Sequence, residues 1–153
     1  MIQENAGKES LRDFLRQTKI KEVMTAKVKT LYVDEELSKA QGIFINDRVF
    51  YIPVIDRDKK LVGLMSHKYL YRTQSPRKFV EGESVYAPGF LIEGDSYYDK
   101  ETLDSYYLRG MMQRNPHTMG PDDSLADAIT TMAVRNLGCV VIVDKETRVA
   151  GML

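Results

Sequence analysis

The side chains that could do chemistry in this sequence are few and scattered. His67 and His117 have no cysteine or carboxylate at metal-ligand spacing, so the sequence predicts no metal site. Cys139 lies in the apolar run Cys-Val-Val-Ile-Val, where a cysteine is usually a small buried hydrophobic residue. The prominent aspartates are explained as helix caps or turn residues: Asp34, Asp56, Asp122 and Asp144. Without a nucleophile beside a base or a glycine-rich phosphate loop, we expect no catalytic residues and no enzyme.

Gly63 and Ser66 lie where a predicted strand gives way to a short helix. Ser66 follows a predicted strand that contains Gly63, and a glycine inside a strand suggests the close approach of another backbone or of a ligand. Ser66 then begins a short helix that runs through Tyr69 and Leu70. A serine before a helix is a good N-cap residue.

Length and composition set outer limits on the function. The chain has 153 residues, enough for one domain or for two small ones that share a core. Lys and Arg number 22 and Asp and Glu number 22, so the net charge gives no reason to expect nucleic acid or a membrane surface as a partner. The apolar runs are far shorter than the roughly 20 residues that span a bilayer, and there is no signal-peptide core. We therefore expect a cytoplasmic protein outside the membrane.

The sequence segments that must hold these side chains in place occur twice in the chain. A shift of 88 residues, from Met24 to Met112, aligns two halves of the chain without a gap. The other identities are Thr30 with Thr118, Asp34 with Asp122, Leu37 with Leu125, Ala40 with Ala128, Asp56 with Asp144 and Gly63 with Gly151. They fall where a cap, a turn or a core needs that residue type, which indicates an internal repeat.

Each repeat has the predicted order β-α-β-β-α, an α+β arrangement. In the first copy we expect a helical turn at 20–24, an extended segment at 28–33, a helix capped by Asp34, strands at 50–55 and 61–65 around a turn at 56–60, and the short helix from Ser66. In the second copy we expect helix at 108–113, extension at 118–119, a helix capped by Asp122 or Ser124, a strand at 139–143, a turn at 144–148 and a strand from Val149.

Two further segments flank or separate the repeats. Within residues 1–19, the segment Ser10–Gln17 should form a short amphipathic helix with Leu11, Phe14 and Leu15 at helical spacing, and this helix should pack on the module or on a second copy. Residues 71–107 form a long connection rich in tyrosine and phenylalanine, which favours a packed segment, a lid over a cleft or a docking surface. Four parts result: residues 1–19, repeat 1 at 20–70, the aromatic segment at 71–107, and repeat 2 at 108–153.

Four motifs make the repeats resemble a known family. They are Ile-Lys-Glu-Val-Met-Thr (20–25), Asp-Glu-Glu-Leu-Ser-Lys-Ala (34–40), Tyr-Ile-Pro-Val-Ile-Asp (51–56) and Leu-Val-Gly-Leu-Met-Ser (61–66). In this order they resemble the cystathionine-β-synthase (CBS) domain, and repeat 2 is the looser copy. The resemblance implies a Bateman module, in which two CBS repeats pack with pseudo-twofold symmetry. It also implies that a final helix follows Leu153 and that two modules form a homodimer.

The resemblance further implies two clefts that take adenine nucleotides or related adenosyl ligands such as AMP, ADP, ATP or S-adenosylmethionine, as regulatory ligands and not as cofactors. Each cleft combines residues from both repeats. The first cleft would use Val28, Lys29, Val49, Phe50 and Tyr51, with a segment that follows Leu153. The second cleft would use Pro116, His117, Leu137, Gly138 and Cys139, with Leu64, Ser66 and Tyr69 from repeat 1. By this resemblance Ser66 would contact a phosphate, while its alternative role is to cap the helix without a ligand.

Tyr69 departs from the family pattern, which has an aspartate there to accept both ribose hydroxyls. A phenol offers one hydroxyl and cannot make that bidentate contact. Tyr69 would then fill the second cleft or stack on a base. Two functions follow from this difference. The chain is either a regulatory module that binds an adenosyl ligand or a ligand-free module, with plugged clefts, for dimerisation or protein interaction.

Overall fold

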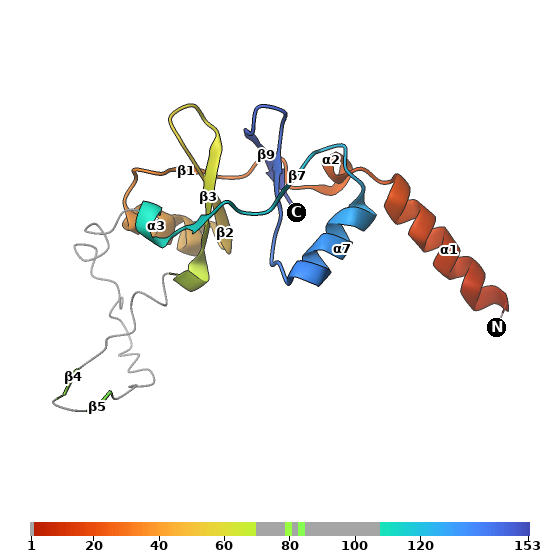
Figure 1. The fold of residues 1–153 in the computed structure, drawn as a ribbon, viewed down its shortest axis with the longest axis horizontal. Coiled ribbons are helices and arrows are strands. Elements are labelled where there is room, and N and C mark those ends of the chain that lie inside the picture. Colours follow the sequence, from red (N-terminus) through yellow and green to blue (C-terminus); the bar gives the residue numbers. More distant parts are fainter. Residues whose placement is uncertain (1, 70–78, 81–82, 85–107) are drawn as a thin grey trace.

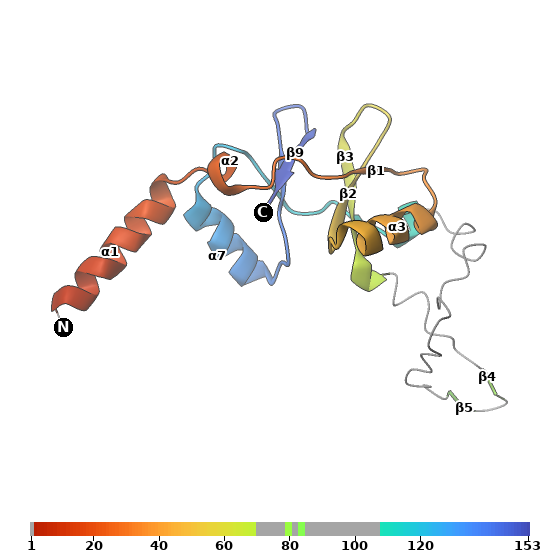
Figure 2. The same cartoon turned by 180° about the vertical axis from the view of Figure 1, so that it is seen from behind.

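The computed structural model describes the backbone of residues 2–69, 79–80, 83–84 and 108–153, and the side chains of 10–69 and 108–153. Two similar units stand side by side, with the N-terminal helix extending from the second (Figures 1 and 2). Most of the aromatic segment at 71–107, with its three expected roles, lies outside the described residues. Within it, strands β4 (Phe79–Val80) and β5 (Glu83–Ser84) form an antiparallel pair.

The fold is α+β, and the elements follow the predicted order with one exception. The helix predicted at 108–113 ends at Met111, and Gln113 instead begins a short strand because its backbone pairs with Leu64 of repeat 1. Repeat 1 contains α2 (Ile20–Val23), β1 (Leu31–Tyr32), α3 (Leu37–Asp47), β2 (Tyr51–Ile55) and β3 (Leu61–Ser66), and residues 67–69 are helical. Repeat 2 contains α6 (Leu108–Met111), β6 (Gln113–Arg114), β7 (Thr118–Met119), α7 (Leu125–Arg135), β8 (Val141–Val143) and β9 (Val149–Met152). One sheet has the strand order β1-β2-β3-β6, and the other has the order β7-β8-β9.

In both hairpins an aspartate stabilises the turn, as predicted. The Asp56 carboxylate accepts hydrogen bonds from the backbone N–H groups of Asp58 and Lys60, both at 2.9 Å. At the corresponding position of repeat 2, Asp144 accepts from the N–H groups of Glu146 and Arg148, at 2.8 and 2.9 Å. The same side chain therefore closes the same turn twice, because a short carboxylate can bond to the backbone just ahead of it.

The prediction that Asp34 caps helix α3 is wrong. The helix begins only at Leu37, so its N-cap residue is Glu36, which makes no side-chain cap hydrogen bond. Asp34 lies too early to reach the free N–H groups and instead accepts a hydrogen bond from Arg57, which lowers the pKa of the Asp34 carboxyl. In repeat 2 the corresponding cap is Ser124, whose hydroxyl accepts from the Asp127 N–H at 3.1 Å. Asp122 pairs with Lys21 at 2.7 Å.

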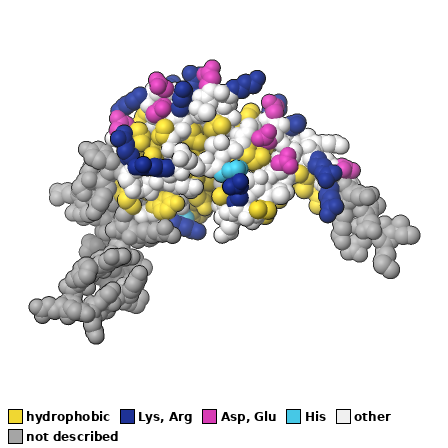
Figure 3. Space-filling view, viewed as in Figure 1, with side chains coloured by type: hydrophobic (Ala, Val, Ile, Leu, Met, Phe, Trp, Pro, Cys, Tyr) yellow, Lys and Arg dark blue, Asp and Glu magenta, His cyan; other side chains and the backbone are white. Residues whose placement is uncertain are grey.

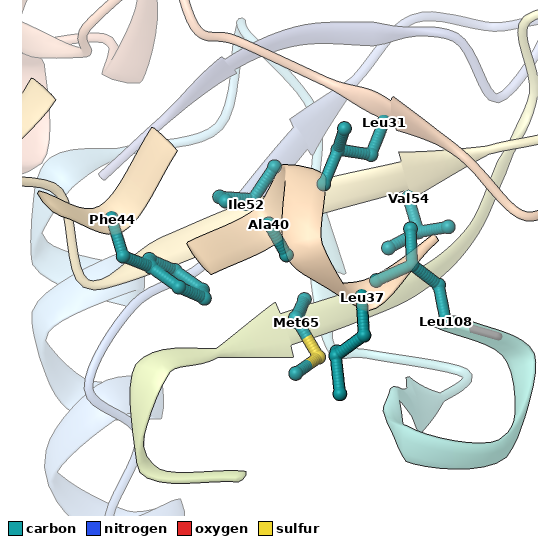
Figure 4. Packing of buried hydrophobic residues seen from close by; sticks show 8 residues of the cluster. All are labelled: Leu31, Leu37, Ala40, Phe44, Ile52, Val54, Met65 and Leu108. Atoms are coloured by element: carbon teal, nitrogen blue, oxygen red, sulfur yellow. The ribbon is translucent and has the colours of Figure 1, made fainter. Parts of the chain in front are cut away.

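Each repeat completes the core of the other. Leu108, the first residue of repeat 2, is fully buried in the repeat 1 core with Leu37, Ile52 and Met65 (Figure 4). Its counterpart Ile20 is fully buried in the repeat 2 core. Accordingly α6 lies beside α3, and α2 lies beside α7 (Figures 1 and 2). The segments that begin the two repeats have therefore changed places.

The sheet edges are exchanged in the same way. Strand β6 of repeat 2 pairs with β3 of repeat 1, and Leu64 lies opposite Gln113. On the other side Thr25 of repeat 1 bridges to Met152 of repeat 2, through N–H to carbonyl bonds of 2.9 and 3.0 Å. Because Thr25 and Gln113 are counterparts, as are Leu64 and Met152, the two halves repeat one pairing under a pseudo-twofold axis.

Glycine is required where the exchanged segments cross. A methyl group on Gly63 would overlap the Met112 sulfur and lie 3.1 Å from the Gln113 carbonyl oxygen. A methyl group on Gly151 would lie 2.7 Å from the Met24 sulfur and 2.8 Å from the Thr25 carbonyl oxygen. The predicted close approach of another backbone at Gly63 is therefore confirmed.

The two sheets face each other through a third apolar cluster. Its buried members are Leu64, Cys139 and Val141, and partly buried neighbours from both repeats surround them. Cys139 is a free cysteine with 9% of its surface exposed. Burial raises the pKa of its thiol to about 11. The prediction that Cys139 is a buried hydrophobic residue is confirmed.

The N-terminal helix is longer than the predicted segment Ser10–Gln17. Helix α1 runs from Ile2 to Gln17, and it lies next to α7 while extending away from the module (Figures 1 and 2). Leu11 and Phe14 are 58% and 61% exposed, and Leu15 is half-buried. From residue 10 onward, where the side chains are described, the apolar residues of α1 are thus only partly covered within one chain.

Replacing Gly63 with alanine tests the crossing. We expect Gly63→Ala to lower the free energy of unfolding by about 1–3 kcal/mol, because the added methyl group overpacks against Met112 and the Gln113 backbone. Urea unfolding measures the change. The matched control is Gly42→Ala in helix α3, where a methyl group meets nothing within 4 Å and should stabilise the helix by about 0.5–1 kcal/mol. Equal stability of Gly63→Ala and the wild type would contradict the close approach.

The reactivity of Cys139 tests the contact between the sheets. A pKa near 11 leaves roughly 100-fold less thiolate at pH 8 than the ordinary value near 9 would. We expect a disulfide reagent such as DTNB to modify the folded protein at least about 100-fold more slowly than the same protein in urea at the same pH. Similar rates in both states would show that this surface is open.

Candidate functional site

The candidate second cleft is built around the paired ends of strands β2 and β3. Tyr51 lies directly opposite Ser66 in this antiparallel pair. Directly paired residues project from the same face of a sheet, so both side chains face repeat 2. Ile52 and Val54, between them in the alternation, face helix α3 and the repeat 1 core. Strand pairing thus gives the candidate site a phenol and a hydroxyl from repeat 1.

Ser66 is one of two buried polar residues among the described side chains, with 7% of its surface exposed. Its hydroxyl oxygen lies 3.4 Å from the backbone nitrogen of Lys68, at the beginning of the helical residues 67–69. A bond of this length is weak. The hydroxyl therefore keeps donor and acceptor capacity for another group.

Repeat 2 contributes the residues that precede and begin its central strand. Cys139 is buried in one cluster with Leu64 of repeat 1, and Tyr51 packs against that cluster. Gly138 lies under the Tyr51 ring, since a methyl group there would overlap the Tyr51 hydroxyl and lie 2.8 Å from Cζ. The structure therefore brings Leu64, Gly138 and Cys139 to one boundary between the repeats, and Ser66 lies beside it as the strand partner of Tyr51.

The other residues predicted for this cleft lie around that boundary. Leu137 packs against the repeat 2 core. Pro116 and His117 are half-buried in the segment before β7, and the His117 carbonyl accepts a hydrogen bond from the Val141 N–H at 3.4 Å. Tyr69 is half-buried and packs against the repeat 1 core. Whether Tyr69 fills the second cleft or stacks on a base stays a prediction.

The residues predicted for the first cleft are less closely gathered. Lys29 forms an ion pair with Asp47 at 2.6 Å, and Val28 is half-buried. Val49 and Phe50 are 36% and 62% exposed, and the Phe50 ring lies 4.9 Å from the His67 ring. The side chain of Tyr51 lies against Gly138 and so adjoins the second cleft.

The position of Tyr51 is the feature that sequence reasoning missed. The alternation of β2 could have revealed it, because Ile52 and Val54 are the core residues and Tyr51 must then face the other repeat. The counterpart of Gly138 is Phe50, so the sequence also showed that only one repeat leaves space for such a ring.

Neither a metal cluster nor a strong charge distinguishes the candidate site. Within the described residues no group of three or more His, Cys, Asp or Glu side chains could hold a metal ion. Charged side chains of both signs alternate on the face shown in Figure 3. Among the helices described, none is long and apolar enough to cross a membrane. What this boundary offers a ligand is a hydroxyl, a phenol and apolar surface.

Comparisons with known proteins agree with this architecture. The CBS domain family matches residues 20–75 and 108–153. The chain is 26% identical over 136 residues to a CBS domain-containing protein of Dictyostelium discoideum, covering 88% of this chain and 83% of that protein. It is 21% identical over 143 residues to a homoserine O-acetyltransferase of Methanococcus vannielii, covering 94% of this chain. The chain spans only 24% of that acetyltransferase.

Solved structures share the fold at low sequence identity. The CBS domain of a CBS domain-containing membrane protein from Sphaerobacter thermophilus superimposes with a TM-score of 0.76 at 20% identity, over 100% of this chain and 93% of that one. The CBS domain pair of protein MJ0100, in complex with 5′-methylthioadenosine and S-adenosyl-L-methionine, has a TM-score of 0.65 at 18% identity, over 89% and 88% of the chains. CBSX2 in complex with AMP has a TM-score of 0.66 at 17% identity, over 89% of each chain.

The two matched regions coincide with the two structural repeats and together make up about two thirds of the sequence. The chain therefore belongs to the CBS domain family, as a tandem pair of CBS domains.

Proposed function

We propose that this CBS pair is a regulatory module that binds an adenine nucleotide or a related adenosyl ligand at the second cleft. The observation that carries the proposal is the meeting of Leu64 and Tyr51 from repeat 1 with Cys139 and Gly138 from repeat 2. Ser66 stands beside this contact, because it is paired with Tyr51 across strands β2 and β3. Ser66 supplies a buried hydroxyl that a ribose or phosphate can use, and the neighbouring apolar surface suits a base.

Proteins of the same fold support the ligand class. The CBS pair of MJ0100 holds 5′-methylthioadenosine and S-adenosyl-L-methionine, and CBSX2 holds AMP. The ligands share an adenosyl group and differ in charge. We therefore expect the adenosine part to be the common requirement for this chain, and the group attached to the ribose 5′ position to vary.

The proposed role is regulation and not catalysis. Most of the aspartates that could serve an active site already close turns or form ion pairs, as Asp34, Asp56, Asp122 and Asp144 do. The homoserine O-acetyltransferases match this chain over a quarter of their length, which is the extent of a CBS pair, so we infer no acetyltransferase activity for this chain.

A ligand that binds here would connect the two repeats. Its contacts come from both sheets, so it favours the arrangement in which the sheets are packed together. We propose that a change in the surfaces beside this packing is passed to a partner protein or to a second copy.

The alternative function is a ligand-free interaction module. One observation at the cleft favours it, because the Tyr51 ring covers Gly138. Apolar side chains are also exposed on helix α7, where Ile129 is 46% and Val134 is 81% exposed. In this alternative the homodimer implied by the family resemblance is the functional state.

Thermal unfolding in the presence of AMP, ADP, ATP, S-adenosylmethionine, NAD and cyclic dinucleotides separates the two functions. At about 100 times its dissociation constant, a ligand specific for the folded state stabilises it by about 2.7 kcal/mol, which is a readily measured shift. We expect at least one adenosyl compound to give it and Ser66→Ala to reduce it. The matched control is Ser38→Ala on α3, which should leave the shift unchanged. If the melting temperature of a well-folded wild type shifts with none of the compounds, the proposed function as a ligand-binding regulatory module is overturned.

A substitution on helix α7 tests whether this helix forms the contact between two copies of the chain. Val134 is almost fully exposed in the single chain, so Val134→Glu should leave the fold intact while placing a charge in an apolar interface. Analytical ultracentrifugation should show a dimer for the wild type and for Val134→Leu, and a monomer for Val134→Glu. A wild-type monomer, or a dimer that tolerates the glutamate, would show that α7 is not the contact.

A further inference from the structure

We propose that Tyr51 determines the base specificity of the second cleft: its hydroxyl accepts a hydrogen bond from the exocyclic amino group of an adenine. This inference rests on the proposed function, because it names a further residue of the same site.

The first step is the location of the ring. Tyr51 begins strand β2 of repeat 1, yet its side chain leaves the repeat 1 core and packs on the cluster between the sheets with Leu64 and Cys139. It stands directly opposite Ser66, and both face repeat 2. A ligand held by Ser66 therefore has Tyr51 as its neighbour.

The second step is the contact that places the hydroxyl. The end of the Tyr51 ring lies on Gly138, where even a methyl group would overlap the hydroxyl oxygen. Any residue other than glycine would push the ring away. The pair Tyr51 and Gly138 therefore fixes a phenol at the boundary between the repeats, at the position where repeat 2 enters its central strand.

The third step is the chemistry of that hydroxyl. Among the described residues, no hydrogen bond to the Tyr51 hydroxyl is found, although the residue is half-buried. A phenol both donates and accepts one hydrogen bond readily, and it usually finds a partner where it is buried. The exocyclic amine of adenine is a donor that suits this acceptor, and the flat base suits the face of the ring.

The fourth step is that the other half of the module lacks this pair. The counterpart of Tyr51 is Cys139, and the counterpart of Gly138 is Phe50. A thiol is a weak hydrogen-bonding group, and Phe50 is exposed and packs beside His67. The phenol therefore makes the second cleft chemically different from the first.

Calorimetric titration of the full chain with AMP and with purine ribonucleoside monophosphate, which lacks the amino group, tests the inference. The wild type should prefer AMP by about 3- to 10-fold, the range expected for one net hydrogen bond. Tyr51→Phe should lose that preference by weakening AMP alone. The melting temperature of the unliganded variant should stay the same, because no described group bonds to the hydroxyl.

The matched control is Tyr32→Phe, which removes a phenol from strand β1, where the ring lies under the Arg57 guanidinium. It should keep the wild-type preference. If Tyr51→Phe also keeps that preference and binds AMP as tightly as the wild type, the role of Tyr51 is refuted while the site stands. If the wild type binds neither nucleotide and is not stabilised by S-adenosylmethionine, the proposed site itself is refuted, and the role of Tyr51 with it.

Discussion

The exchange of the two N-terminal segments is the constraint on which the rest of this structure depends. Ile20 and Leu108 are fully buried, and each is buried in the repeat to which it does not belong by sequence. The backbone follows the same exchange, since β6 completes the first sheet and Thr25 bridges to the edge of the second. Neither repeat closes its own core, so the pair must fold as one unit.

The same exchange creates the candidate site and makes its two halves unequal. Crossing at Gly63 and Gly151 brings the sheets close enough for Leu64, Cys139 and Val141 to form one cluster. The crossing itself is symmetric, because corresponding methionines and backbone carbonyls lie against the two glycines. The side chains beyond it are not symmetric, and the exchange of Tyr51 for Cys139 and of Gly138 for Phe50 gives each cleft its own chemistry.

Much of this fold was accessible from the sequence, because the determining residues act locally. Asp56 and Asp144 predicted their turns, and the shift from Met24 to Met112 predicted the repeat. The cap of α3 was mispredicted because Asp34 and Glu36 both suit a helix start, and only the position of Leu37 decides between them. Helix α1 also begins earlier than predicted, at Ile2, because the apolar pattern that predicted it starts only at Leu11.

Two features could not be predicted from local sequence: the exchange of the N-terminal segments between the repeats, and the direction of the Tyr51 side chain. A helical turn with Ile20 on its apolar side looks the same whether it covers its own sheet or the other one. For Gly63 the sequence indicated that something approaches closely, but not that it is Met112. For the candidate site, the family resemblance supplied Ser66, Gly138 and Cys139 for the second cleft and Tyr51 for the first, and it did not indicate that the Tyr51 ring lies against Gly138.

The free energy gained by burying the exchanged segments also limits how a ligand can act on this module. Burying a side chain such as Ile20 or Leu108 contributes about 1.5–3 kcal/mol each, before any sheet hydrogen bond is counted. A ligand at about 100 times its dissociation constant contributes about 2.7 kcal/mol. That is too little to separate or rejoin the repeats. A regulatory signal must therefore pass through elements held by weaker contacts, and helix α1, with Leu11 and Phe14 exposed, is such an element.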